Sequence, residues 1–305
     1  MLNYLVRRLL ATLPVLLGIS FVSFMLLHLS GDPTDFLLPI DVPEATRQAF
    51  RQEHGFDRPI LHQFWDFLRK AVTGDFGTSL RFQQPAGSLV WERVGATTEL
   101  AGAAMMVALV VGIPAGTIAA YRYGGVIDRV VRAVALIGQA IPNFYLGVVA
   151  IIVFAVWFRV LPSGGRGTWE QLILPALTLG FALVALIARV TRSCMLDALR
   201  DDYVRTARAK GLGETAVVLR HGLRNAFIPV LTVIGLQFGL LLNGVVVTEI
   251  VFSWPGIGRL AIQSIYARDF PVVQTIVFLS ALTFVALNLI VDLLYAVLDP
   301  RISYK

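Results

Sequence analysis

The sequence predicts an all-α integral membrane protein with six transmembrane helices, and three observations support this fold class. Apolar residues make up 56% of the chain and charged residues only 15%, whereas a typical globular protein has about 25% charged residues. The mean hydropathy of +0.72 is high for a soluble protein. Six segments are long enough and apolar enough to cross a bilayer, and the loops between them alternate in their content of basic residues.

A transmembrane helix needs about 20 mostly apolar residues. Six segments meet this requirement, with approximate bounds of 9–29, 98–120, 133–158, 172–192, 228–250 and 273–298. The first follows Arg7 and Arg8, as a secretory signal would, but its apolar run is longer than the roughly 7–15 residues of a signal peptide and no A-x-A cleavage site follows. Residues 1–30 are therefore predicted to form an uncleaved span.

Residues 31–97 are polar and are predicted to form a small periplasmic cap. One helix in the cap is expected to begin near Pro43-Glu44 and to end at Gly55, because proline favours the start of a helix and glycine its end. Residues 98–298 are predicted to form a core of five spans with a cytoplasmic loop at 193–227, and residues 299–305 a cytoplasmic tail. Prolines within spans are tolerated when neighbouring groups satisfy the freed carbonyls. They are interpreted as shaping the helix bundle, with a role in gating as the alternative: Pro14, Pro114, Pro142 and Pro229.

Lysine and arginine in short loops set the orientation of a membrane protein. With the N-terminus inside, the cytoplasmic loops hold 15 basic and six acidic residues, whereas the outer side holds 11 basic and 13 acidic residues. Asp292, the remaining acid, lies within the last span. Both termini are therefore predicted to be cytoplasmic. This topology also explains the net charge of +6, so the charge does not indicate nucleic-acid binding. The single cysteine, Cys194, excludes a disulfide within the chain and a zinc site with several thiolates.

The loop between the fourth and fifth predicted spans is polar and basic from Asp201 onward. Its first helix is expected to end at Gly211, because glycine tolerates the positive φ that turns the chain. A short second helix with an apolar face is expected to follow before the chain re-enters the membrane at Pro229. Such a helix can dock into the groove of a partner protein or rest on anionic lipid, and the residues alone leave both readings open.

This loop resembles the cytoplasmic "EAA" loop of ABC importer permeases, because Ala207 and Gly211 match its Ala-x-x-x-Gly spacing. The loop looks most like the dipeptide, oligopeptide, glutathione and nickel branch of that family, and Arg205-Thr206 stand where Glu-Ala is usual. Further matches follow in order along essentially the whole chain: Gly31–Pro33, Gly74–Gly77, Ser253–Arg259, Arg268–Gln274 and Asp299–Arg301. Within the branch, Met1–Tyr4 and His62–Trp65 look most like glutathione permeases, with dipeptide permeases close.

The resemblance implies the type I ABC importer permease fold in the bacterial inner membrane. It implies a complex with a homologous second permease, two ATPase domains and a periplasmic substrate-binding protein, and contact with membrane lipid. It implies import of short peptides, glutathione or di- and oligopeptides, with nickel-chelate import as the alternative. The chain would be non-catalytic and without a cofactor, since the ATPase partners would bind ATP and Mg²⁺. The residues implied to couple this chain to the ATPases are Arg205, Thr206, Ala207, Gly211, Leu212, Glu214, Leu219 and His221.

Outside this loop, the sequence offers few sites. The four histidines show no metal-binding spacing and no phosphate-binding loop occurs. Polar residues inside spans are costly in lipid and often functional, so four amides are candidates for the translocation path: Gln139, Asn143, Gln237 and Asn243. Hydrogen bonding between helices is an equal alternative for them, and is favoured for Asp292. A secondary transporter would instead show mid-span acids or two related halves, and neither is evident.

Overall fold

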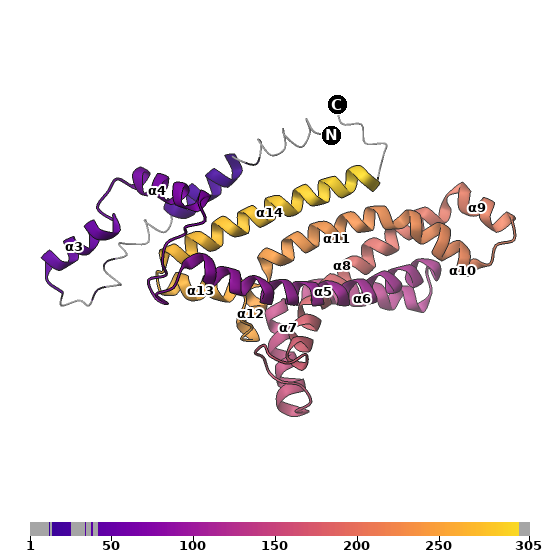
Figure 1. The fold of residues 1–305 in the computed structure, drawn as a ribbon. Helices are drawn as coiled ribbons and strands as arrows, with labels where there is room; N and C mark the ends of the chain where they lie inside the picture. The colour runs from indigo at the N-terminus through magenta and orange to yellow at the C-terminus, as the bar shows by residue number, and fades with distance from the viewer. Residues whose placement is uncertain (1–11, 13, 26–33, 35–37, 39–41, 299–305) are drawn as a thin grey trace. The chain divides into compact units, whose positions relative to one another are not determined.

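The computed structural model describes residues 12, 14–25, 34, 38 and 42–298, which are drawn as a coloured ribbon in Figure 1. The regular secondary structure of these residues is helical, and an isolated β-bridge joins Thr78 to Pro85. The chain divides into two compact units. One is formed mainly by residues up to Gly95 together with Gly256–Leu289, and the other mainly by Ala96–Pro255.

The first unit contains the apolar helix Pro14–Met25, α3 (Glu44–His54), α4 (Ile60–Val72), the beginning of α5 (Ala86–Tyr121), α13 (Ile257–Tyr266) and most of α14 (Phe270–Leu298). The helix predicted between Pro43 and Gly55 is confirmed. Gly55 has φ +71°, and the N–H of Phe56 donates to the carbonyl of Arg51 at 2.8 Å. This is the left-handed C-terminal cap that glycine favours.

Two segments far apart in the sequence are joined by a buried carboxylate in this first unit. Asp269 accepts hydrogen bonds from the Ser79 hydroxyl and, at 3.1 Å, from the N–H of Leu80. Asp269 is fully buried, and a buried charge must find such partners to be tolerated. The contact therefore fixes the turn that follows Gly77 against the start of α14.

The second unit contains most of α5 and the helices that follow it in order: α6 (Val126–Ala140), α7 (Asn143–Ala150), the π-helix η1 (Ile151–Trp157), α8 (Glu170–Arg200), α9 (Asp202–Ala209), α10 (Glu214–Ala216), the π-helix η2 (Val217–Leu223), α11 (Arg224–Gly244) and α12 (Val246–Val251). Helix α8 lies at the centre and packs against α6, α7 and α11. Within this unit, Figure 1 shows α7 running across the direction of α6.

Small residues allow α5 and α8 to approach closely. A Cβ added at Gly116 would lie 2.4 Å from the carbonyl oxygen of Ala188, and one added at Gly180 would lie 3.1 Å from the carbonyl oxygen of Ala104. Because lipid provides little hydrophobic drive for helices to associate, such close packing is a main source of stability in a membrane bundle. The buried cluster around Leu100, Ala104 and Ile187 lies at this contact.

The apolar helices occur at the positions of the predicted spans. Three helical stretches are long and apolar enough to cross a membrane: Ala86–Tyr121, Glu170–Arg200 and Glu214–Leu241. A bent pair, Val126–Ala140 with Asn143–Trp157, makes a fourth if it counts as one span, and Pro14–Met25 and Phe270–Ala286 are shorter apolar helices. The count of six spans stays a prediction. The predicted cytoplasmic ends, residues 1–11 and 299–305, lie outside the described residues.

The predicted span at 133–158 is broken at Pro142. Helix α6 ends at Ala140, α7 begins at Asn143, and the two are bent by 100°. Proline lacks the N–H that would continue the helix, and its ring pushes the preceding residue into an extended conformation. Ile141 accordingly has φ −84° and ψ 124°. In contrast, Pro114 and Pro229 lie inside α5 and α11 without ending them.

Candidate substrate pocket and coupling loop

A pocket of about 480 Å³ opens in the second unit where α6, α7, α8 and α11 meet. Three amide side chains line it: Gln139 near the end of α6, Asn143 at the start of α7, and Gln237 on α11. Three of the four predicted path residues are therefore brought together. The fourth, Asn243, belongs to α11, but its side chain is not among the described ones.

The break at Pro142 builds the pocket. It ends α6 at Ala140, one residue after Gln139, and starts α7 at Asn143, so two amides flank one bend. Gly138 holds this end of α6 close to α8, because a Cβ there would lie 2.9 Å from the Cβ of Ala185. A continuous helix would place residues 139 and 143 one turn apart along a single face. The bend instead directs the chain after Pro142 along a new axis.

The chemistry of the pocket is that of a site for a polar but uncharged group. Apart from its three amides, the lining consists of glycine, proline, alanine, isoleucine and leucine, and no charged side chain is part of it. Each amide offers both hydrogen-bond donors and acceptors. Small-molecule sites commonly have about 300–1,000 Å³ and combine apolar walls with a few polar groups. The pocket matches this description, while its role in translocation stays a prediction.

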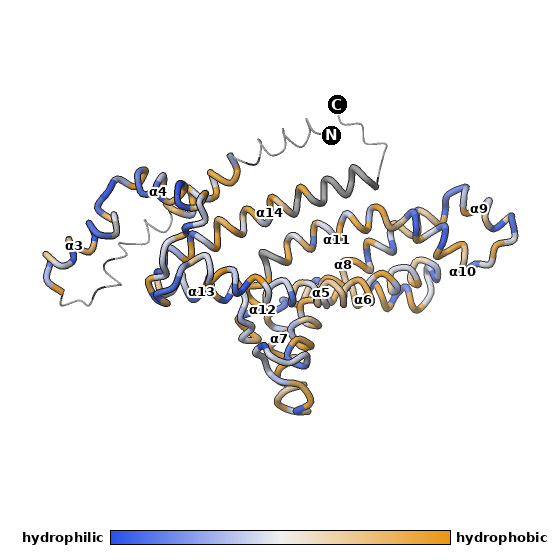
Figure 2. Tube along the Cα trace, in the orientation of Figure 1, coloured by the Kyte–Doolittle hydropathy of each residue, from blue (hydrophilic) through white to orange (hydrophobic). Residues whose placement is uncertain are grey.

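The second predicted site is the loop around α9, which is mostly blue in Figure 2, in contrast to the largely orange α8 and α11. Helix α9 buries Val204 and Ala207 against Val217. The helix ends at a turn in which Gly211 has φ +79°, and the N–H of Leu212 donates to the carbonyl of Ala207 at 3.4 Å. The predicted glycine turn is confirmed.

The residues predicted to couple to a partner do not share one environment. Five of them are exposed and accessible to another protein: Arg205, Thr206, Gly211, Leu212 and Leu219. Ala207 is only 4% exposed, so it holds α9 onto its own chain and is not available as a contact residue. His221 is half-buried in η2, and its carbonyl accepts from the Asn225 amide at 2.9 Å.

An ion pair that the sequence analysis missed closes the turn. Arg208, at the end of α9, donates to both carboxylate oxygens of Glu214, with Nη2 to Oε1 at 2.7 Å and Nε to Oε2 at 3.2 Å. The hydrogen bond to Glu214 raises the pKa of the Arg208 guanidinium further. The two residues flank Gly211, so the pair spans the turn. The sequence offered one signal for this pair, since two opposite charges lie six residues apart with a glycine between them.

The short second helix expected after Gly211 is not a separate element. Residues Glu214–Leu241 form one continuous helical stretch that includes α10, η2 and most of α11. The apolar face expected on that second helix comprises Ala216, Val217 and Leu219, and the structure divides it. Val217 is buried because α8 and α9 cover it, and the neighbouring Val218 is buried as well. Ala216 and Leu219 remain exposed.

Sequence analysis also missed Glu249, a fully buried carboxylate in α12. Its Oε1 accepts from the Thr97 hydroxyl at 2.7 Å, and near it the Trp254 indole donates to the carbonyl of Ala96 at 2.8 Å. Glu249 was within a predicted span, where an acidic residue is itself a signal. No cluster of three or more potential metal ligands occurs among the described residues.

Comparison with known proteins agrees along the whole chain. Residues 112–304 match the family model described as "Binding-protein-dependent transport system inner membrane component". Residues 1–92 match the corresponding N-terminal model of such membrane components. The "Glutathione transport system permease protein GsiC" of Escherichia coli (strain K12) is 45% identical over 306 residues, which covers 100% of both chains. The protein of the same name from Shigella flexneri serotype 5b (strain 8401) is also 45% identical over 100% of both chains.

Solved structures share the fold. An inward-facing form of the MetNI methionine ABC transporter gives a TM-score of 0.52 at 23% identity, covering 67% of this chain and 95% of that chain. An amino acid ABC transporter crystallised with histidines gives a TM-score of 0.51 at 16% identity, covering 68% of this chain and 92% of that chain. Both support the type I importer permease fold.

Proposed function

We propose that this chain, which belongs to the binding-protein-dependent transport system inner membrane components, imports short peptides. As a member of that family, it is a multi-pass inner membrane permease subunit of an ABC importer. Glutathione is the leading proposed substrate, and di- and oligopeptides come next. The observation that carries the proposal is the 45% identity to glutathione permeases over the full length of both chains.

The pocket supports a peptide over a metal chelate. Peptide groups present N–H donors and C=O acceptors, which the three pocket amides can satisfy. A nickel site would be expected to offer imidazole or softer ligands. The pocket lining contains no histidine, cysteine or carboxylate. Nickel-chelate import is therefore the second candidate.

In this proposal, ATP hydrolysis by partner chains supplies the energy for transport. Two ATPase domains would bind ATP and Mg²⁺, a homologous second permease would complete the pathway, and a periplasmic binding protein would deliver the substrate. Within this proposal, the chain carries no catalytic residue, and the loop around Gly211 contacts the ATPases. Exposed Arg205, Thr206 and Leu212 are the residues best placed for that contact. The purified chain alone should hydrolyse no ATP.

The test is uptake by the complete complex, with its binding protein, in proteoliposomes. Labelled glutathione should enter only with ATP, and dipeptides should compete more weakly. Import of a nickel chelate without competition by any peptide would overturn the peptide assignment and leave the importer assignment intact. Uptake driven by an ion gradient without ATP would instead identify a secondary transporter.

The pocket is tested by replacing its amides with a residue of similar size. Gln237→Leu and Gln139→Leu should each raise the substrate concentration for half-maximal uptake roughly tenfold, since each removes a hydrogen-bonding partner. Gln263→Leu on α13 is the matched control, because Gln263 does not line the pocket. Unchanged uptake in both pocket variants would remove this pocket from the path.

A further inference from the structure

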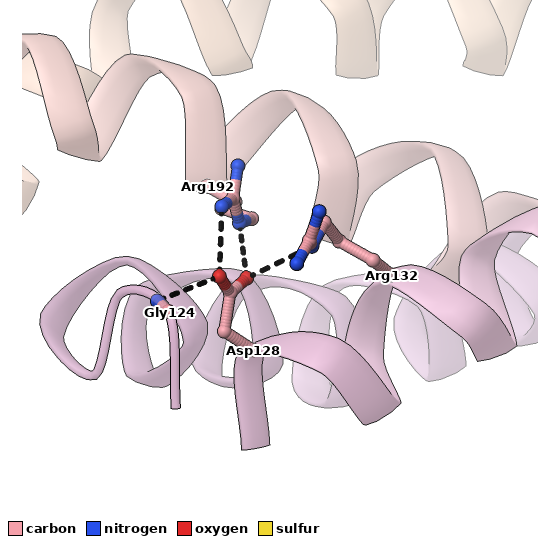
Figure 3. Close-up of polar contacts among 4 residues, drawn as sticks. All are labelled: Gly124, Asp128, Arg132 and Arg192. Carbon is pink, nitrogen blue, oxygen red and sulfur yellow. Dashed lines mark hydrogen bonds and ion pairs between the residues drawn. The ribbon is translucent and has the colours of Figure 1, made fainter. Parts of the chain in front are cut away.

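A buried ion-pair cluster fastens the beginning of α6 to α8, and Figure 3 shows its four residues. Asp128 is fully buried and accepts two hydrogen bonds from Arg192 of α8, with the Nη2–Oδ2 distance at 2.9 Å. The N–H of Gly124 donates to Asp128 at 3.0 Å, and Arg132 lies at 3.5 Å, one turn along α6. We call Asp128 and Arg192 the α6–α8 clamp.

The clamp is enclosed on more than one side. The Arg192 guanidinium lies 5.5 Å from the centre of the Tyr123 ring, and the side chain of Arg192 is 16% exposed. A two-pronged arginine–carboxylate contact fixes direction as well as distance. Together with the Gly124 contact, it sets both the separation and the relative rotation of the two helices at this end.

Each member of the clamp leads by an unbroken helix to one of the two candidate sites. Arg192 is on α8, which continues to Arg200 and is followed directly by α9 and the coupling loop. Asp128 is on α6, which continues to Gln139 on the wall of the pocket. At about 1.5 Å per residue, Gln139 is roughly 16 Å along the helix from Asp128.

The same two helices meet a second time beside the pocket. Gly138 of α6 lies against Phe181 and Ala185 of α8, with 2.9 Å between its added Cβ and the Cβ of Ala185. Helix α8 also contributes Leu179 and Leu183 to the pocket wall. One contact near the coupling loop and one beside the pocket prevent α6 from sliding or turning against α8.

We propose that the α6–α8 clamp is a positioning pair for transport, which makes α6 follow the movement of α8 so that displacement of the coupling loop reaches Gln139 and the bend at Pro142. The inference rests on the proposed function, because it requires ATP-driven uptake. Asp128 and Arg192 touch neither substrate nor nucleotide in this account. They act through α6, and their loss separates ATP hydrolysis from movement at the pocket.

The experiment measures uptake and ATP hydrolysis in the same proteoliposomes, using complex that has assembled and been purified. In Asp128→Asn and Arg192→Gln, labelled glutathione taken up per ATP hydrolysed should fall roughly three- to tenfold, in the range by which coupling residues change the linkage between two sites. A purely structural role would lower the yield of complex and leave this ratio unchanged. The matched control is Glu99→Gln, which disrupts an exposed arginine–carboxylate pair in the same unit.

A covalent replacement provides the rescue. Asp128→Cys with Arg192→Cys, in a Cys194→Ala background, should show the lowered ratio. A short bis-methanethiosulfonate reagent, which forms a disulfide with each thiol and releases methanesulfinate, should restore the ratio until a dithiol reductant cleaves the two disulfides. A wild-type ratio in both single variants, or a cross-link that leaves the ratio low, would overturn the positioning role. Absence of ATP-driven uptake in the wild-type complex would contradict the proposed function itself. The wild-type measurement therefore separates failure of the proposed function from failure of the positioning role.

Discussion

Two arginine–carboxylate pairs within the second unit have similar geometry and very different surroundings. Arg192 holds Asp128 with side-chain exposures of 16% and 0%, whereas Arg166 holds Glu99 at 2.7 Å with exposures of 40% and 41%. The first joins two helices, and the second joins the loop before α8 to the part of α5 that belongs to the second unit. Burial, more than distance, therefore decides how much each pair contributes.

The physical reason is solvation. An exposed ion pair exchanges contacts with water for a contact that water screens, so it contributes about 0–1 kcal/mol. A buried pair has already lost its water, and removing one partner leaves an uncompensated charge inside the protein. The exposed pair is also not the sole support of its loop, because the N–H of Gly165 donates to the carbonyl of Phe252 at 2.8 Å.

The largest expected effect is that of Arg192→Met. It leaves Asp128 buried with Gly124 and a half-exposed Arg132, and should lower stability by about 3–5 kcal/mol. Thermal unfolding of the detergent-solubilised protein measures it. Asp128→Leu combined with Arg192→Met should recover most of the loss, since apolar pairs of similar volume often replace buried ion pairs. A single variant as stable as wild type would show that water reaches the cluster.

Gly164→Ala should be the next most damaging change and tests what holds the exposed loop. A Cβ at Gly164 would lie 2.1 Å from the carbonyl oxygen of Phe252, so the backbone must move. Overpacking of this kind costs about 1–3 kcal/mol. Gly167→Ala in the same loop is the control, because its Cβ would meet its nearest neighbour at 3.5 Å. Equal melting temperatures for both variants would contradict the backbone contact.

Gly211→Val tests the coupling loop, which lies beyond the clamp along α8. A Cβ there meets open space, so the strain of the substitution comes from the backbone φ of +79° and not from a steric clash. A left-handed conformation costs about 1–2 kcal/mol for a residue with a side chain, and the turn should distort locally. Uptake and substrate-stimulated ATP hydrolysis should fall together while assembly persists. Gly213→Ala, which also meets open space at negative φ, is the control.

The smallest effect is expected for Glu99→Gln. Stability should fall by no more than about 1 kcal/mol, because both partners are well solvated. The remaining difference from wild type should shrink further at high salt, which screens exposed charges. A loss comparable to that of Arg192→Met would mean that exposure does not separate the two pairs.

Local chemistry made several features predictable. Proline before Glu44 and glycine after His54 bound α3 as expected, and the glycine at 211 ends its loop helix. The apolar segments are helical where hydropathy places them. Three amides chosen only because lipid disfavours them line one pocket. In each case, the determinant lies within a few residues of the feature.

The missed features depend on distant partners or on the direction of the chain. Hydropathy records how apolar a segment is, and it does not record that the helix axis turns at Pro142. Asp128 was counted only as one acid among basic residues, because nothing near it in the sequence shows that Arg192 would enclose it. Val217 was expected on an apolar docking face, but residues of α8 and α9 cover it.

The π-helix η2 determines the direction in which the side chains of the following helix, α11, face. Each residue of a regular α-helix turns the chain by about 100°, and a π-helical turn accommodates an extra residue within the same continuous helix. Removing one residue between Val217 and Leu223 would rotate α11 by about that angle relative to α10. Gln237 would then face away from the pocket, although nothing near it had changed. The set of side chains that line the pocket therefore depends in part on the length of a segment several turns upstream. A one-residue deletion there would replace Gln237 in the pocket wall by a different residue of α11.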